Sequence, residues 1–296
     1  MGVLAVLAAA LLWSVVPICV KRLLPVFDPV AIAWMRFVMG SSLLGAVALA
    51  RRKLPVRISA RQWRWLALAG AGMGGNYIFY NLGVRYTTAG ATNLIVQSEV
   101  VGLVILSWLF LGERIGLKKL SGLLLCVGGV VLVILTTGDV SAGLGGEALV
   151  GNLWVLAAGL SWSFYGLGQR VLSRQIPPTV SVAGIFGVAA FLSAPWALPR
   201  LGPAGPVTGT SVLLLLIVGI LSTGAAYTLL AVGFARLSAS AVGALTCTLP
   251  LFTIVEARIL IGEPVTAPLL SGAAAVIGGI LLVIRAERGR YVTAGE

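Results

Sequence analysis

Two stretches of the chain, 150 positions apart, end in the same way. Residues 94–113 read LIVQSEVVGLVILSWLFLGE and close on Leu-Gly-Glu, while residues 244–263 read ALTCTLPLFTIVEARILIGE and close on Ile-Gly-Glu. Further pairs keep a spacing of 149 or 150 along most of the chain: Trp13-Ser14 with Trp162-Ser163, Lys21 with Arg170, Tyr77 with Tyr227, Gly83 with Gly233, Ser121-Gly122 with Ser271-Gly272, and Gly128-Gly129 with Gly278-Gly279. So many matches in one order indicate an internal repeat.

The composition places this repeat in a membrane. Of 296 residues, 59% are apolar and 10% are charged, and the mean hydropathy is +1.04. A soluble domain carries about 25% charged residues, so this chain could not solvate the surface of a globule of its size. The composition therefore excludes a soluble enzyme, a DNA-binding domain and a disordered chain.

The net charge of +12 does not indicate a nucleic-acid partner, because the basic residues flank apolar runs instead of gathering on one soluble face. The chain contains no histidine, which removes Ser-His-Asp catalysis, Cys-His catalysis and His-ligated metal sites together. We expect no catalytic residues, no metal and no cofactor. The expected partners are a small-molecule substrate, membrane lipid and protons, in a monomer or a homodimer.

Apolar runs broken by charge, glycine or proline predict ten membrane helices. In lipid every backbone polar group must be paired within the protein, and no run shows the alternation of a barrel strand. The predicted fold is an all-α integral membrane protein of ten transmembrane helices, with five helices in residues 1–148 and five in residues 149–296. The expected spans are 3–24, 30–50, 64–84, 88–111, 119–137, 150–170, 179–198, 211–233, 239–261 and 268–286.

Basic residues set the expected orientation. With the N-terminus in the cytoplasm, fifteen basic residues fall on the inner side and five on the outer side, and six of the fifteen lie between residues 51 and 64. This asymmetry predicts a multi-pass protein with both termini cytoplasmic. Because each repeat has an odd number of spans, the second unit enters the membrane from the opposite side. Such an inverted repeat is typical of transporters that open to each side in turn.

The same residues resemble a known family. Trp-Ser in the first span, Arg36-Phe37 in the second, and Leu-Gly-Glu after the fourth with its recurrence after the ninth are similar to the EamA type of the drug/metabolite transporter superfamily. The resemblance implies a 5+5 inverted repeat in a bacterial inner membrane that exports small metabolites, and it is strongest to exporters of amino acids, including aromatic ones. One departure is that the family's Glu-Pro pair in spans four and nine reads Glu99-Val100 and Leu249-Pro250 here.

Glu99 is the first candidate for function, because it lies near the middle of the expected span 88–111. A charge at that depth costs several kcal/mol, so the carboxyl group must face a cavity, find a partner or carry a proton. We expect it to couple transport to protons or to bind a cationic group, with a hydrogen bond from its protonated form to a neighbouring helix as the alternative. Asn93 and Gln97, spaced i and i+4, are expected to share its polar span on one helix face.

Arg36 and Glu256 lie at similar depths in spans two and nine, so they could form an ion pair if those helices touch. Alternatively, Arg36 snorkels toward headgroups or holds a substrate carboxylate. Polar and aromatic side chains at membrane depth complete the predicted substrate site, with core packing as the alternative for the tryptophans: Trp13, Ser14, Asn76, Tyr77, Tyr80, Asn93, Gln97, Glu99, Trp162 and Tyr227.

Glu113 and Glu263 stand at membrane ends, where we expect local salt bridges and helix capping. The leading functional prediction is alternating-access export of amino acids with aromatic or other apolar side chains, or of related amphipathic compounds. An intramembrane enzyme, a channel-like permease and an importer are the alternatives. The enzyme is disfavoured by the absence of histidine, and the channel is disfavoured because no span has a continuous polar face.

Overall fold

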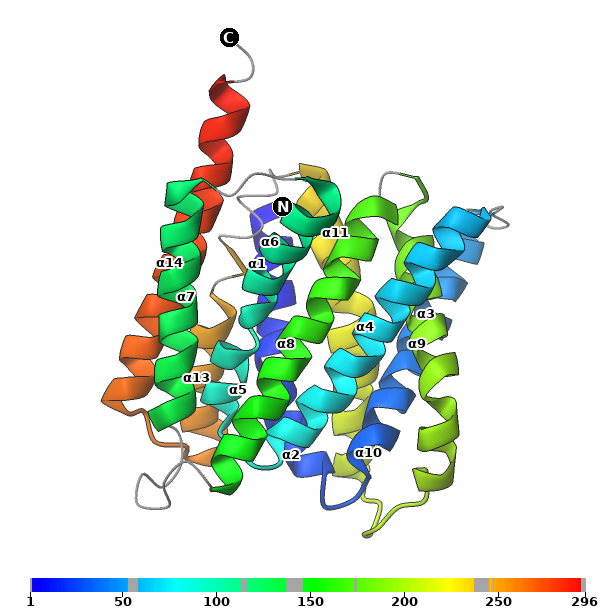
Figure 1. Cartoon of the computed structure of the whole chain (residues 1–296). Helices are drawn as coiled ribbons and strands as arrows, with labels where there is room; N and C mark the ends of the chain where they lie inside the picture. The colour runs from blue at the N-terminus through cyan, green and yellow to red at the C-terminus, as the bar shows by residue number, and fades with distance from the viewer. Residues whose placement is uncertain are drawn as a thin grey trace.

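The computed structural model describes residues 2–52, 58–112, 116–136, 146–172, 175–236, 245–246 and 248–293. All regular structure in these residues is helical (Figure 1). The first half contains α1 (Gly2–Ser14), α2 (Val16–Leu23), α3 (Pro29–Ala50), α4 (Ala60–Val84), α5 (Ala89–Ile95), α6 (Ser98–Leu111) and α7 (Leu117–Thr136). The second half contains α8 (Glu147–Leu172), α9 (Pro178–Ala197), the 3₁₀ turn η2 (Leu198–Arg200), α10 (Gly209–Leu216), the π-helix η3 (Ile217–Ala225), α11 (Ala226–Arg236), α13 (Leu249–Ile261) and α14 (Ala267–Thr293).

Eight of the described helical segments are long and apolar enough to cross a membrane. They are Gly2–Leu23, Pro29–Ala50, Ala89–Phe110, Leu117–Thr136, Glu147–Gln169, Thr179–Arg200, Gly209–Leu230 and Ala267–Arg285. Two expected spans are not among them. The helix α4 carries Arg61, Arg64 and several polar residues, and only 13 residues of α13 form its described helix. The chain is therefore a multi-pass membrane protein, and the count of ten helices stays a prediction.

Three of the expected spans are not single α-helices. The first bends at Val15, because Pro17 in the first turn of α2 has no N–H to continue the ladder. The fourth divides at Val96 and Gln97 into α5 and α6. The expectation that Asn93 and Gln97 share a face of one continuous helix is therefore wrong, since the helix is interrupted between them. The eighth span runs through α10, η3 and α11.

The helix ends explain why the repeated Leu-Gly-Glu motif recurs. Gly112 ends α6 with φ +68° and Gly262 ends α13 with φ +70°, the left-handed conformation that a glycine adopts without a steric penalty. At the other helix ends, Ser59 begins α4 in a capping box with Gln62, and Thr208 begins α10 in the same way. Local sequence thus fixes matching start and stop points in the two halves.

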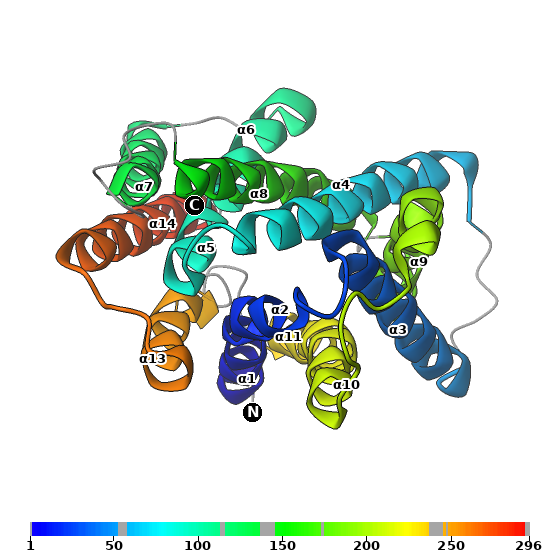
Figure 2. The ribbon, with the colours of Figure 1, turned by 90° about the horizontal axis from the view of Figure 1, so that it is seen from below.

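Helices from the two halves pack against one another across the bundle. The most extensive contacts join α4 with α8, α7 with α14, α3 with α9, α4 with α9, α6 with α8 and α1 with α11, and each of these pairs takes one helix from either half. Figure 2 shows α1, α2, α10 and α11 on one side of the bundle and α4, α8 and α6 on the other. The first helix begins and the last helix ends at the same end of the bundle (Figure 1).

Candidate functional site

Aromatic side chains from both halves meet in the middle of the bundle. Tyr227 is the centre of this group, with ring centroids 5.2 Å from Trp13, 5.3 Å from Phe186 and 6.1 Å from Tyr165, all edge-to-face. Edge-to-face pairs at such distances are favourable beyond the area that they bury. We call the whole group the aromatic cluster, and its members are Trp13 on α1, Phe37 on α3, Tyr77 on α4, Trp162 and Tyr165 on α8, Phe186 on α9, and Tyr227 on α11.

Arg36 on α3 forms the cationic edge of the aromatic cluster. Its guanidinium carbon lies 4.1 Å from the centroid of the Tyr77 ring, and its Nε–H donates to the backbone oxygen of Val218 at 3.3 Å. A cation over an aromatic face is stabilised by the ring quadrupole. Only 3% of Arg36 is exposed, and no described carboxylate lies within 4 Å of it. The terminal nitrogens of this buried guanidinium have no acceptor among the described residues, so they can serve an incoming anion.

Glu99 lies in the first turn of α6, directly after the helix break. The residue is half-buried, and its carboxylate has no hydrogen-bond or ion-pair partner among the described residues. The Ser163 hydroxyl on α8, next to Trp162 of the aromatic cluster, donates to the Glu99 backbone oxygen at 3.0 Å. Arg36 and Glu99 are therefore two ionisable groups that pair with no opposite charge among the described residues.

Three further residues of the predicted substrate site, Gln97, Trp162 and Trp13, differ in the contacts that their side chains make. Gln97, the N-cap position of α6, is 7% exposed and makes no side-chain cap bond. Trp162 on α8 packs edge-to-face on Tyr165, with ring centroids 5.2 Å apart. The Trp13 indole donates to the backbone oxygen of Ser222 at 2.7 Å. Both mid-span tryptophans are thus members of the aromatic cluster, and Trp13 also bonds to the second half of the chain.

A second polar group joins spans one, three, four and nine. The Tyr80 hydroxyl donates to Asn93 Oδ1 at 3.0 Å, and Asn93 Nδ2 donates to Thr253 Oγ1 at 2.5 Å. Thr253 in turn donates to the backbone oxygen of Ser14 at 3.0 Å, and Ser14 Oγ donates to Glu256 Oε1 at 2.9 Å. The Oε2 atom of Glu256 is buried and has no hydrogen-bond partner in the part of the chain that the structure describes. We call these five residues the polar chain.

One predicted pairing is not what the structure shows. Arg36 and Glu256 do not form an ion pair, because Arg36 is held by Val218 and Tyr77 while Glu256 accepts from Ser14. Separately, the Asn76 Nδ2 donates to the backbone oxygen of Ala158 on α8 at 2.9 Å. In this conformation Asn76 therefore joins two helices.

The capping role predicted for Glu263 is confirmed. Its carboxylate lies 2.6 Å from Lys21 Nζ and accepts from the backbone N–H groups of Ala89, at 2.9 Å, and Gly90, at 3.4 Å. These two N–H groups open α5, where the helix dipole favours a negative charge. Arg22 adds a bond to the backbone oxygen of Leu260 at 3.0 Å. Glu113, its repeat counterpart, lies outside the described residues.

Sequence reasoning missed several members of the site. Thr223 and Thr253 are both fully buried. Thr223 donates to the Val218 backbone oxygen that also accepts from Arg36, and Thr253 accepts from Asn93. Phe186 and Tyr165 complete the aromatic cluster. The repeat could have found Phe186, since it stands 149 positions after Phe37 and the two rings stack at 6.3 Å. Isolated threonines in apolar runs give no such signal, because most of them bond their own helix.

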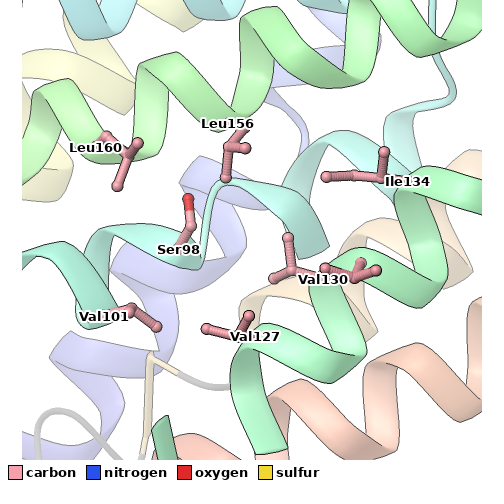
Figure 3. A pocket seen from close by; sticks show the side chains of 8 residues that line it. Ser98, Val101, Val127, Val130, Ile134, Leu156 and Leu160 are labelled. Carbon is pink, nitrogen blue, oxygen red and sulfur yellow. The ribbon is translucent and has the colours of Figure 1, made fainter. Parts of the chain in front are cut away.

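An apolar cavity lies apart from this site. It has a volume of about 160 Å³ and is enclosed by α6, α7 and α8, as Figure 3 shows. Its lining offers no polar surface, and Val127, Val131 and Leu160 are exposed on the outside of the bundle. This cavity therefore faces lipid and does not receive the charged groups of a substrate. Its lining residues are Ser98, Val101, Val127, Val130, Val131, Ile134, Leu156 and Leu160.

Comparison with known proteins agrees with this architecture. The chain matches the EamA-like transporter family twice, over residues 1–135 and 149–285. It is 30% identical over 257 residues to a protein of Escherichia coli (strain K12) described as the uncharacterized inner membrane transporter YhbE, covering 86% of this chain and 79% of that one. It is 29% identical to the uncharacterized transporter YvbV of Bacillus subtilis (strain 168), covering 92% and 88%.

A solved crystal structure also superposes on the chain, with a TM-score of 0.68 and 22% sequence identity over 97% of each chain. That likeness concerns the fold alone. The two family matches span nearly the whole sequence, and the helices that they cover supply every member of the aromatic cluster. The protein is a membrane transporter that belongs to the EamA-like transporter family.

Proposed function

We propose that this transporter exports small zwitterionic metabolites, namely amino acids with aromatic or other apolar side chains, across the inner membrane. The observation that carries the proposal is the pair of unpaired charges around the aromatic cluster. Arg36 is buried with free guanidinium donors, and Glu99 has no partner among the described residues. Buried charges in a membrane protein cost several kcal/mol, and that cost is offset when a substrate pairs with them.

The chemistry of the site fits the two ends of an amino acid. A guanidinium binds a carboxylate with two parallel hydrogen bonds, so Arg36 would hold the α-carboxylate. Glu99 would then accept from the α-ammonium group. The aromatic cluster offers rings for an apolar side chain, and edge-to-face contacts with a bound aromatic ring would add specificity. A substrate with a single charge would leave one of the two protein charges unpaired.

We further propose that the ten helices form two inverted five-helix units, residues 1–148 and 149–296, that rock about the site. The helix contacts support this symmetry. Extensive contacts between the units have counterparts in which every helix is replaced by its repeat mate. The contact of α4 with α8 corresponds to that of α11 with α1, and the contact of α4 with α9 corresponds to that of η3 with α3. The contact of α6 with α8 corresponds to that of α13 with α1. The partners α3 with α9 and α7 with α14 are each other's repeat mates. Alternating access follows if the two units exchange conformations.

The described conformation would be closed at the end opposite the termini. There, Glu263 joins Lys21 of α2 to the start of α5. The excess of basic residues on the other side of the membrane makes this the outer end. In the proposed cycle, these bonds break when the substrate leaves to the outside. Protonation of the empty Glu99 would neutralise its charge during the return step, which couples export to proton entry.

Counterflow in proteoliposomes tests the proposal. Vesicles loaded with unlabelled L-phenylalanine should accumulate labelled L-phenylalanine from outside, and this should saturate with concentration. A thermal-shift panel of amino acids, sugars and cationic drugs on the purified protein gives the substrate class, and hits should vanish in Glu99→Gln and Trp162→Ala. Linear flux without counterflow would indicate a channel. Counterflow that survives both substitutions unaltered would overturn the site.

A further inference from the structure

The second unit contains one more residue than the first within its third helix. The N-caps Ser59 and Thr208 stand 149 positions apart, whereas Tyr77 and Tyr227 stand 150 apart. Tyr77 therefore lies 18 positions after its N-cap and Tyr227 lies 19 after its own. Eighteen residues make five turns of an α-helix with 3.6 residues per turn, so Tyr77 lies directly above Ser59 on one helix face.

The π-helix absorbs this extra residue. In a continuous α-helix one added residue would turn Tyr227 by about 100° relative to its N-cap, away from the aromatic cluster. The segment η3 (Ile217–Ala225) lies between Thr208 and Tyr227, and a π-helix takes up an inserted residue without rotating the α-helices on either side. Tyr227 remains at the centre of the cluster for this reason.

The wider π turn also supplies the acceptor that holds Arg36. Val218 is the fifth residue before Thr223, and its backbone oxygen accepts from Thr223 Oγ1 at 2.8 Å and from Arg36 Nε at 3.3 Å. The same hydroxyl lies 3.4 Å from the hydroxyl of Tyr77, whose ring lies under the guanidinium. Arg36 is thus fixed from two sides, by the carbonyl of Val218 and by the ring of Tyr77.

Small residues allow α3 and η3 to approach closely enough for these bonds. A Cβ atom added to Gly40 would come within 2.6 Å of Thr223 Cγ2. Cβ atoms added to Gly219 and Gly224 would overlap the side chains of Met39 and Leu43 on α3. Val218 and Thr223 are fully buried as a result. At positions 149 and 150 after Arg36, the second unit has Ile185 and Phe186. The second unit therefore has no arginine that corresponds to Arg36.

We propose that η3 is a positioning element that aims Arg36 at the substrate's carboxylate, with Thr223 and the Val218 carbonyl as its positioning groups. This inference rests on the proposed function, because it assigns Arg36 the carboxylate end of the substrate. The Val218 oxygen engages Nε and leaves the two terminal nitrogens without an acceptor among the described residues, while the guanidinium carbon lies 4.1 Å from the centroid of the Tyr77 ring. The inserted residue in the second unit therefore determines specificity for carboxylates without touching the substrate.

The test compares L-phenylalanine with its methyl ester, which keeps the ring and the ammonium group but lacks the carboxylate. Binding of each compound to the purified full chain is measured by titration calorimetry, and the ratio of the two Kd values is the readout. Thr223→Val removes the hydroxyl at nearly constant volume and should lower the preference for the acid about fivefold. Thr223→Ser should retain it. Deletion of Ile220, which returns the segment to α-helical spacing, should lower the preference at least as much.

Thr228→Val is the matched control, because Thr228 bonds Gly224 in an ordinary i to i−4 contact and should leave the ratio unchanged. Arg36→Gln tests the proposed function separately and should abolish the preference. If Arg36→Gln abolishes it while Thr223→Val and Thr223→Ser both equal the parent protein, the positioning role is overturned and the proposed function stands. If Arg36→Gln leaves the ratio unchanged, Arg36 does not bind the carboxylate and both proposals fail.

Discussion

The two glutamates Glu263 and Glu99 meet opposite surroundings in the same bundle. At one end, Glu263 accepts from Lys21 and from the first N–H groups of α5. Halfway along the bundle, Glu99 follows a helix break and has no partner among the described residues. A carboxylate near the membrane surface is satisfied by local groups, whereas one at mid-depth costs free energy until something arrives to pair with it.

This difference separates structural charges from charges that are available for transport. The bonds of Glu263 are made within the protein, so they stabilise one conformation and must break in another. The unpaired state of Glu99 favours no conformation by itself, but it makes binding of a cation or a proton favourable. The comparison assigns conformational control to the end of the bundle and substrate recognition to its middle, and four experiments test that division.

The strongest test holds the end of the bundle closed. Cysteines placed at positions 21 and 263, in a background without Cys19, Cys126 and Cys247, should react with a short bifunctional maleimide. In the described conformation Lys21 Nζ and Glu263 Oε1 are 2.6 Å apart, so cysteines at these two positions lie within reach of the reagent. Cross-linking should hold this end closed and therefore abolish counterflow of L-phenylalanine. Each single cysteine variant treated with the same reagent is the control. Full transport by the cross-linked protein would show that this end does not open.

The second test removes the unpaired charge at mid-depth. Glu99→Gln keeps the shape of the side chain but removes its charge, so L-phenylalanine counterflow should fall about 10- to 100-fold, the value of a hydrogen bond to a charged group. Thermal unfolding should change little, since no described bond is lost. Glu147→Gln, at the start of α8, is the control for a carboxylate at a membrane end. Parent-level counterflow in Glu99→Gln would contradict the assignment.

The third test makes the same change at the other glutamate. Glu263→Gln loses the ion pair with Lys21 and weakens the cap on α5, which should lower stability by about 1 kcal/mol. We expect a lower thermal midpoint with an unchanged Kd for L-phenylalanine. A weaker Kd with an unchanged midpoint would reverse the roles that the comparison gives to the two carboxylates.

The smallest expected effect belongs to the lysine of the ion pair. Lys21→Met leaves Glu263 its bonds to Ala89 and Gly90, and the lysine side chain is 27% exposed. Solvent screening therefore limits the loss to below about 1 kcal/mol. The difference in thermal midpoint from the parent protein should shrink further in high salt. A loss as large as that of Glu263→Gln would mean that the ion pair, and not the helix cap, holds this end together.

Much of the helix arrangement could be predicted from local patterns. Each expected span contains described helix, and α3 (Pro29–Ala50) and α7 (Leu117–Thr136) differ from the expected 30–50 and 119–137 by at most two residues at an end. The breaks were harder to foresee. Pro17 predicts the bend in span one, but no proline or glycine stands at the interruption at Val96 and Gln97. That break depends on tertiary packing, which local propensity does not contain.

The candidate site divides in the same manner. Residue type and depth were enough to select Arg36, Glu99, Tyr77 and Tyr227, because charged and aromatic side chains are rare and costly in lipid. Their partners were not accessible in this way. Arg36 is equally deep whether it pairs with Glu256 or with the carbonyl of Val218, and only the position of η3 decides between them. Asn76, chosen for its polarity, bonds the backbone of α8, a partner that its residue type does not predict.

The sequence by itself determined that this protein lies in a membrane, that its two halves repeat, and which few polar side chains are buried at depth. These properties follow from composition and spacing, which are linear along the chain. The tertiary structure alone decided that Glu99 pairs with no described residue, that Arg36 bonds a π-helix, and that Phe37 stacks on Phe186. Contacts between residues more than 140 positions apart depend on how whole helices pack, and no local pattern records that packing.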